Sequence, residues 1–409
     1  MSLFAEDLRL RRLSQMGDPL EKIGTAVDWE MFRPTLREAF AREPKGPGGR
    51  PPLDRVMMFK ILMLQEWNHI ADDNAEYLIN DRLSFQRFLG LGLGDKVPDA
   101  KSIWLFRENL RLSGADKKLF ALFAEQMQAL GLITRSGSIV DAVFAESPRQ
   151  HNTKEEKATI REGKVPEEWK KEENAHKLAQ KDTDARWTKK RQDYHFGYKD
   201  HVKVDKDSKL ITAYAVTPAS THDNQAIADL VDETDKEIYA DSAYDGEPVA
   251  ERIKKKAPNA KLRIHRKASR NHPLTEEEKK GNQEKSKVRC RVEHVFGQMT
   301  MFMGGTAVRA VGLARVTTCL TLKNLAYNLS RYEILVRQKS ARSPAAGQVC
   351  LLGGKWKKQQ EVEQENTLFP GRNPSFSPPS FQKNSPHLFC PPLMWFLEVP
   401  NSLSIALSN

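Results

Sequence analysis

Cysteine is scarce in this chain: 409 residues contain four, the widely separated Cys290, Cys319, Cys350 and Cys390. No two of them form a Cys-x-x-Cys pair, so the sequence predicts neither a zinc site nor a disulfide framework. The chain also lacks a run of about 18 uninterrupted apolar residues, which a transmembrane helix requires. Its N-terminus, MSLFAEDLRLRR, mixes charges early and lacks the apolar core of a secretory signal. These absences favour a cytoplasmic, nucleoid-associated protein with no membrane partner.

Positive charge is abundant, and it is concentrated in one place. The net charge is +11, and residues 251–292 alone hold fifteen Lys and Arg against five Asp and Glu. This stretch includes the run Lys254, Lys255 and Lys256. A cationic surface attracts a phosphate backbone, and the alternative is a solvated lysine-rich loop. We favour double-stranded DNA as the ligand, because the acidic residues described below point to the same substrate.

Residues 1–132 are expected to form a helical N-terminal domain. One helix is indicated by apolar residues at three- and four-residue steps, namely Leu53, Met57, Ile61 and Leu64. A later helix is expected to begin after Asp99, which can cap it. Such a domain suits DNA binding or dimerisation, and no sharp helix-turn-helix signature decides between the two.

The pattern of expected strands and helices in residues 133–338 predicts an α/β domain with a mixed sheet and helices on both faces. The order is three strands, helix, strand, helix, strand and two helices; an opening hairpin is antiparallel, whereas the later crossovers require parallel neighbours. Residues 146–195, with thirteen basic and eleven acidic residues, are expected to be a charged insertion, partly helical and partly mobile. The last helix is expected to end near Val336.

The C-terminal residues 339–409 differ in composition from the rest. Nine of the 22 prolines of the chain lie in residues 340–409. Because proline interrupts regular helix, this tail is expected to be disordered or weakly packed.

Three acidic residues stand in contexts that suggest chemistry. Asp141 and Asp241 each follow a short β-branched or aromatic run that predicts a buried strand, and Glu293 lies in a segment with helical spacing. A carboxylate at the end of a hydrophobic strand costs desolvation energy unless a cation or hydrogen bonds compensate it. Two such acids and a third on a helix can converge on divalent metal, and two-metal sites cut and join phosphodiesters.

The chain resembles the DDE transposases of bacterial insertion sequences, in the insertion-sequence-five group, whose catalytic domain has a ribonuclease H-like fold. The resemblance covers roughly residues 30–335 and rests on five blocks: Gly49-Arg50-Pro51-Pro52, Phe196 to His201, Thr221 to Asn224, Ala240 to Tyr244, and Arg289 to Gly297. It implies that Asp141, Asp241 and Glu293 are the catalytic acids and the metal ligands. The implied metal is Mg²⁺, with Mn²⁺ as a substitute, because hard cations prefer carboxylate oxygen.

The family often carries Tyr, Arg and Lys around its final Glu. Arg289 fills the Arg position one helical turn before Glu293, whereas Ser286 and Thr300 stand where Tyr and Lys are expected. The guanidinium of Arg289 can hold a DNA phosphate, and a simple ion pair with Glu293 is the alternative. Lys287 is expected to supply a further phosphate contact.

Other polar residues allow two interpretations each. Lys199 and His201 alternate on one predicted strand and face either DNA or solvent. Thr221 or Asp223 is expected to cap a helix, an interpretation we favour over a catalytic role for this segment. Core packing is the favoured role of three methionines, Met299, Met301 and Met303.

The resemblance implies a cut-and-paste DNA transposase. Water would attack the phosphodiester at the end of the element, and the released 3′-hydroxyl would attack target DNA without a covalent enzyme intermediate. The implied partners are the terminal inverted repeats, the target duplex and further copies of the chain, as a homodimer or higher oligomer on DNA. The alternatives are a nuclease of the same fold that does not join DNA, and a domesticated or decayed DNA-binding protein.

Overall fold

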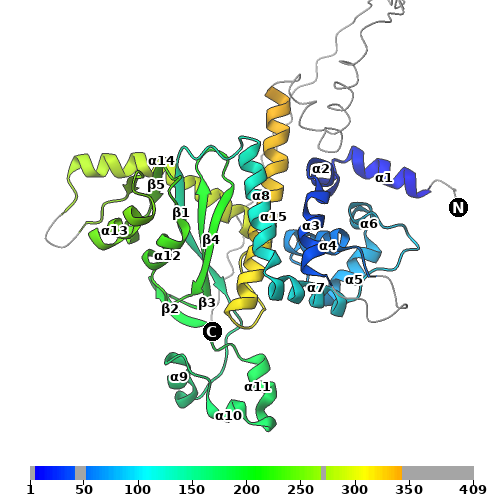
Figure 1. The fold of residues 1–409 in the computed structure, drawn as a ribbon, viewed down its shortest axis with the longest axis horizontal. Helices are drawn as coiled ribbons and strands as arrows, with labels where there is room; N and C mark the ends of the chain where they lie inside the picture. The colour runs from blue at the N-terminus through cyan, green and yellow to red at the C-terminus, as the bar shows by residue number, and fades with distance from the viewer. Residues whose placement is uncertain (1–4, 42–51, 269–272, 343–409) are drawn as a thin grey trace, which may run out of the picture. The chain divides into compact units, whose positions relative to one another are not determined.

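The computed structural model of the chain describes residues 5–41, 52–268 and 273–342. Its N-terminal part is helical (Figure 1). The helices are α1 (Ala5–Gln15), α2 (Pro19–Ala26), η1 (Trp29–Phe32), α3 (Arg33–Ala39), α4 (Arg55–Asn68), α5 (Asp72–Asp81), α6 (Leu83–Leu89), α7 (Ala100–Ser113) and α8 (Ala115–Ala129).

The local sequence explains where α7 begins and ends. The carboxylate of Asp99 accepts a hydrogen bond from the backbone N–H of Ser102 at 2.7 Å, which confirms the predicted cap. The helix ends at Gly114, whose φ of 65° lies in the left-handed region that favours glycine. Helix α6 was not predicted from the sequence.

The second part of the chain contains a six-stranded mixed sheet. Its strands are β1 (Ser138–Glu146), β2 (Arg186–Lys190), β3 (Asp193–Asp205), β4 (Ile211–Pro218), β5 (Glu237–Ala240) and β6 (Lys261–Ile264). Strand β3 is antiparallel to β1, β2 and β4, whereas β5 is parallel to both β1 and β6. This is the ribonuclease H-like mixed sheet that the resemblance implied.

Helices cover both faces of this sheet. Successive residues of a strand point to opposite faces, so Ile139 and Val140 pack into different hydrophobic clusters on the two sides of the sheet. Val140 packs in a cluster with residues of α12 (Asp223–Leu230) and α13 (Glu247–Lys256). Ile139 belongs to a cluster with residues of α14 (Glu276–Phe302) and α15 (Leu313–Arg342). Asp141, two residues beyond Ile139, therefore lies on the side of α14.

The core on the α14 and α15 side continues into the N-terminal helices. Leu62 of α4, Phe123 of α8 and Leu325 of α15 are buried in the same cluster as Ile139. Helix α15 packs against α4, α8, α2 and α7 as well as against β4 (Figure 1). The N-terminal helices are thus joined to the sheet through one shared core, and the division of the chain at residue 132 stays a prediction.

The charged insertion is partly helical and is attached to the sheet. It contains α9 (Lys154–Arg161), α10 (Glu167–Lys170), η2 (Glu172–Asn174), α11 (Ala175–Gln180) and the unpredicted strand β2. Trp169 of α10 is fully buried. Beyond α11, the buried carboxylate of Asp182 accepts hydrogen bonds from the hydroxyl of Tyr198 on β3 and from the N–H of Gly312 before α15.

Helix α15 is longer than predicted. It continues to Arg342 rather than ending near Val336, because the residues after Val336 include the good helix formers Arg, Gln, Lys and Ala. The predicted tail from residue 343 onward lies outside the described residues. In the described part of the chain, no helix is both long and apolar enough to cross a membrane.

Asp200 on β3 and Asn324 on α15 form an unusual buried pair. Asn324 Nδ2 donates to Asp200 Oδ2 at 3.0 Å, while Asp200 Oδ1 and Asn324 Oδ1 are buried and have no hydrogen-bond partner among the described residues. A proton on Asp200 would remove the cost of burying an unpaired carboxylate charge. Burial raises the pKa of Asp200 to about 7, so the native state retains this proton at pH values where the unfolded chain has lost it.

Asp200→Asn is expected to remove this source of pH dependence. An acid with a raised native pKa contributes stability that is present below its unfolded pKa of 3.8 and lost as the pH rises through about 7. Relative to wild type, the variant should gain up to about 4 kcal/mol in unfolding free energy across that window. Urea unfolding at several pH values measures the difference, and parallel pH profiles would contradict the prediction. The control is Asp205→Asn, because the Asp205 carboxylate accepts bonds from the Arg135 and Ser208 backbone N–H groups, so that variant should not show the gain expected for Asp200→Asn.

Candidate active site where two parallel strands separate

Asp141 and Asp241 occupy equivalent positions on two neighbouring parallel strands. The last paired residues of β1 and β5 are Val140 and Ala240. The next residue along the chain is an aspartate in both cases, Asp141 within β1 and Asp241 directly after β5. Neighbouring strands lie about 4.8 Å apart. At this point β5 turns away into η3 (Ser242–Tyr244), while β1 continues to Glu146. The carboxyl ends of parallel strands that separate in this way are the usual place for a site in an α/β sheet.

Asp141 is largely buried and strongly held. Its Oδ1 accepts a hydrogen bond from the N–H of Ala142 at 2.9 Å, and its Oδ2 accepts one from Arg289 Nη1 at 2.9 Å. Burial raises the pKa of Asp141 and the negative charge of Asp241 adds to the rise, while the Ala142 N–H and the Arg289 charge oppose it. The charged form of Asp141 is therefore destabilised at this position, and a nearby cation would stabilise it.

Asp241 is stabilised in its charged form. It precedes η3 as its N-cap, and its Oδ1 accepts from the N–H of Ala243 at 3.2 Å. Burial opposes ionisation, but the hydrogen bonds from Ser242 and Ala243, together with the charge of Arg289, outweigh it, so the pKa of Asp241 is lowered. Two adjacent carboxylates thus have pKa values moved in opposite directions.

Arg289 joins the strand acids to Glu293 on α14. Its Nη1 holds Asp141, and its Nη2 lies 3.8 Å from Glu293 Oε1, one helical turn away. The ion pair with Glu293 considered from the sequence is present, but the shorter contact is to Asp141. Glu293 is well exposed, with 66 % of its side chain accessible, and Arg289 Nε is buried without a partner in the described part of the chain.

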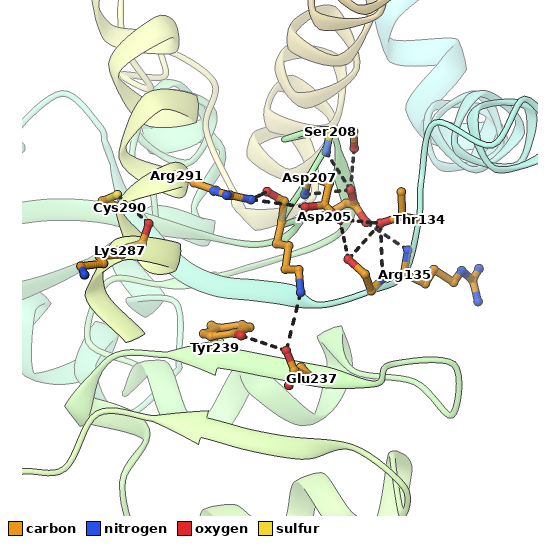
Figure 2. A network of polar contacts seen from close by, with 12 residues as sticks. Thr134, Arg135, Asp205, Asp207, Ser208, Glu237, Tyr239, Lys287, Cys290 and Arg291 are labelled. Atoms are coloured by element: carbon orange, nitrogen blue, oxygen red, sulfur yellow. Dashed lines mark hydrogen bonds and ion pairs between the residues drawn. The ribbon is translucent and has the colours of Figure 1, made fainter. Parts of the chain in front are cut away.

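Helix α14 is linked to the β3–β4 turn by the polar network in Figure 2, through Arg291, which lies two residues from both Arg289 and Glu293 in the sequence. Arg291 Nη1 donates to the backbone oxygen of Lys206, in the turn between β3 and β4, at 2.6 Å. The ammonium of Lys206 in turn lies 3.6 Å from Glu237 Oε2 at the start of β5. The Arg291 contact fastens α14 to the β3–β4 turn two residues before Glu293, whereas the Lys206–Glu237 pair links that turn to β5.

No closed metal cage is formed by these residues. Within the described ranges, no three Asp, Glu, His or Cys side chains gather closely enough to hold a metal ion, so the predicted convergence on a shared metal pair is not preformed. The physical reason is that carboxylates repel one another without a cation, and here Arg289 supplies the positive charge between them. The donor set itself, carboxylate oxygens at a strand end, fits a hard divalent cation.

The predicted DNA ligands differ in accessibility. Lys287 on α14 is exposed, as are Lys254, Lys255 and Lys256 at the end of α13. Lys199 requires a correction, because its side chain is only 12 % exposed and its ammonium binds Asp223 Oδ1 at 2.8 Å. Its role in DNA binding stays a prediction, but in this structure the ammonium holds the segment before α12.

His201 also differs from expectation. It is fully buried, its Nε2 pairs with Thr217 Oγ1 at 2.8 Å, and burial lowers its pKa to about 4. His201 is therefore out of contact with solvent, and Lys199 is largely so. The reason is that β3 is an interior strand, covered by α12 on the face where alternation places both residues.

Two smaller predictions are corrected by the structure. The N-cap position of α12 is His222 and no side chain caps the helix, so neither Thr221 nor Asp223 does so. Asp223 is instead the first helical residue and binds Lys199. Of the three methionines, Met299 and Met303 are buried as expected, but Met301 is 78 % exposed, because a residue two positions along a helix points to the opposite side.

Sequence reasoning missed Tyr244 and Lys190. Tyr244 is buried, its hydroxyl has no partner among the described residues, and its pKa is raised by burial and by the charges of Asp223, Asp141 and Asp241. The positive charge of Lys190 on β2 is one of the contributions that lower the pKa of Asp141 against the effect of burial. The position of Tyr244, three residues after Asp241, was a signal in the sequence; Lys190 gave none, because β2 lies within the charged insertion.

Comparison with known proteins identifies two matching families. The family model described as "Transposase DDE domain" matches residues 133–329, which contain the sheet and all three acids. The model described as "Transposase domain (DUF772)" matches residues 8–109, in the helical N-terminal part. Among solved structures, a cryo-EM structure of the piggyBac transposase synaptic complex with hairpin DNA is similar, with 13 % identity, a TM-score of 0.41, and coverage of 88 % of this chain and 87 % of that chain. A match at that level carries no argument about this chain.

Proposed function

The chain belongs to the transposases with a DDE domain and is a DNA transposase, and we propose that Asp141, Asp241 and Glu293 are its catalytic acids. One observation supports this assignment above the others. The two aspartates lie side by side where β1 and β5 separate, and Arg289, 148 residues beyond Asp141, connects that aspartate to Glu293.

We propose that the same three carboxylates hold the divalent cation of the enzyme, Mg²⁺ or, as a substitute, Mn²⁺. Bound there, the cation would activate the attacking oxygen and stabilise the leaving oxygen. Arg289 already places a positive charge beside two of these acids, Asp141 and Glu293. With a cation bound to the acids, the guanidinium of Arg289, whose side chain is 24 % exposed, would be available to a DNA phosphate.

The proposed reaction has two phosphoryl transfers. In the first, a water oxygen bonds to the phosphorus at the end of the element, and the bond from phosphorus to the 3′ oxygen breaks. In the second, the resulting 3′-hydroxyl loses its proton and bonds to a phosphorus of the target, whose own 3′ oxygen leaves. Both steps are direct displacements, so no Ser or Tyr nucleophile is needed.

The proposed DNA surface extends from Arg289 and Lys287 on α14 to Lys254, Lys255 and Lys256 on α13. The three α13 lysines are exposed, and they belong to the cationic stretch of residues 251–292 in the sequence. Each phosphate that such residues neutralise releases counterions, so binding should weaken steeply with salt. The proposed partners are terminal inverted repeats and target DNA at the nucleoid, bound by a homodimer or higher oligomer.

A strand-transfer assay tests this function. The substrate is a duplex with the inverted repeat that brackets the reading frame, already cut to expose its 3′-hydroxyl, together with a supercoiled plasmid and Mg²⁺. Joining of the duplex to the plasmid is the expected result. Cleavage of uncut ends without joining would indicate the non-joining nuclease, and binding without either reaction would indicate a decayed DNA-binding protein.

A further inference from the structure

The hairpin of β2 and β3 has two different faces. In its register, Trp187 is opposite Phe196 and Lys189 is opposite Tyr194. Directly opposed residues of an antiparallel pair share a face, and alternation places all four of these side chains on the same one. Lys190 and His195 lie on the other face.

The first face presents aromatic rings to solvent beside positive charges. Trp187 is 45 % and Tyr194 is 58 % exposed. The guanidinium of Arg149 lies 5.7 Å from the centre of the Trp187 ring, and Lys189 Nζ lies 5.2 Å from that of Tyr194. Buried Phe196 supports Trp187 at a ring distance of 5.1 Å. The rings are therefore held on a strand pair rather than on a flexible loop.

The second face is attached to the strand that carries Asp141. Lys190 Nζ lies 5.4 Å from the centre of the Phe144 ring, which stacks on His195 at 4.2 Å with an angle of 7° between the planes. Phe144 is three residues beyond Asp141 on β1, and the charge of Lys190 acts on that carboxylate. The aromatic face is thus carried by an element that adjoins the candidate active site.

We propose that this aromatic face binds unpaired nucleotides of the DNA end that is being processed, with Trp187 and Tyr194 stacking on bases and Arg149 and Lys189 contacting phosphates. The inference rests on the proposed function, because it assigns the ligand to DNA beside the catalytic acids. Stacking on an aromatic ring requires a base that has left the duplex stack, and it is tolerant of sequence.

The charge of the hairpin favours DNA over a protein partner. Lys189, Lys190 and Arg191 of the hairpin and the neighbouring Arg149 outnumber the one acid of residues 186–197, Asp193, and the nearby Glu146 pairs with His195 at 2.7 Å. A nucleotide offers a base that can stack on the ring and a phosphate that can pair with the adjacent cation. A protein partner does not in general supply both groups at this spacing.

Fluorescence anisotropy without divalent cation tests the inference separately from catalysis. Two DNAs are compared, a fully paired duplex with the end of the element and the same duplex with a few unpaired nucleotides at that end. Wild type should prefer the second. Trp187→Ala should weaken binding of the unpaired end roughly five- to a hundredfold and leave duplex binding unchanged, whereas Trp187→Phe should retain most of the preference.

Trp104→Ala provides a matched control. Trp104 on α7 is 44 % exposed and has Arg315 at 6.0 Å from its ring centre, so it reproduces the chemistry of Trp187 in the helical N-terminal part. Its loss should leave the ratio of the two affinities unchanged. Replacing Lys254, Lys255 and Lys256 together by Glu should weaken both DNAs alike, because these lysines would contact phosphates only.

The outcomes separate the two proposals. If wild type bound neither DNA, the proposed function would fail. If it bound both and Trp187→Ala left the ratio unchanged, the inference alone would be overturned. It would also be overturned if Trp187→Ala altered the sedimentation of the DNA-free protein while both affinities stayed the same, because the face would then be a contact between copies of the chain.

Discussion

Asp241→Asn is expected to lower cleavage of the transposon end at least about a thousandfold, since several kcal/mol of transition-state stabilisation depend on the metal ligands. The neutral amide is a poorer ligand than the carboxylate. The fold should survive, because the Asn oxygen can still accept the N–H of Ala243 that Asp241 accepts at 3.2 Å. A gel assay of end cleavage in Mg²⁺, with DNA binding measured in parallel, provides the test.

The matched control for this variant is Glu237→Gln. Glu237 is a carboxylate on the same strand, but it pairs with Arg263 and Lys206 and contacts none of the three candidate acids in the interactions described. Its neutralisation should leave cleavage close to that of wild type. If Asp241→Asn lost folding and DNA binding together, Asp241 would be a structural acid. If the variant cleaved at the rate of wild type, the active site would lie elsewhere.

The two aspartates could be predicted from the sequence because local patterns carry them. Each follows an apolar run that forms a strand of the expected kind, β1 for Asp141 and β5 for Asp241. Their proximity depends on the parallel register of the two strands, with Val140 opposite Ala240. A single sequence does not encode that register locally, and only the family resemblance supplied it in advance.

Of the two contacts of Arg289, only the one within its own helix could be predicted from local sequence. Its position one helical turn before Glu293 predicted the pair that is observed at 3.8 Å. The stronger bond, to Asp141 at 2.9 Å, joins residues 148 positions apart and depends on how α14 packs on β1. Spacing along a helix predicts contacts within that helix, whereas contacts between elements require the packing.

Lys199 and His201 were misplaced for a related reason. Alternation along a strand predicts which residues share a face, but not whether a helix covers that face. Here α12 covers it, so the lysine that suggested a polar surface is largely covered and the histidine is fully buried, and both have polar partners. Strand β2 was missed for a different reason: Trp187 is the single apolar residue of Arg186–Lys190, so the segment lacks the apolar period of a buried strand.

Among the substitutions considered, we expect one in the charged insertion, at Asp182, to have the largest effect on the free energy of unfolding. Asp182 is 4 % exposed. Its oxygens accept hydrogen bonds from Tyr198 Oη at 2.7 and 2.8 Å, from the Gly312 N–H at 3.1 Å, and from the N–H groups of Asp184 and Ala185. One carboxylate therefore connects the insertion, an interior strand and the start of α15.

Asp182→Ala is expected to lower the free energy of unfolding by about 3–5 kcal/mol, because it leaves several buried donors without an acceptor. The control is Asp184→Ala. Asp184 is only partly buried and accepts the N–H of Leu313 at 2.9 Å, so its loss should cost about 1 kcal/mol, as for a helix cap. Urea unfolding of both variants gives the comparison. Equal and small losses would show that the insertion is an appendage. A loss several times larger for Asp182 would show that the catalytic fold depends on the insertion, which holds α15 against the strand that pairs with β1.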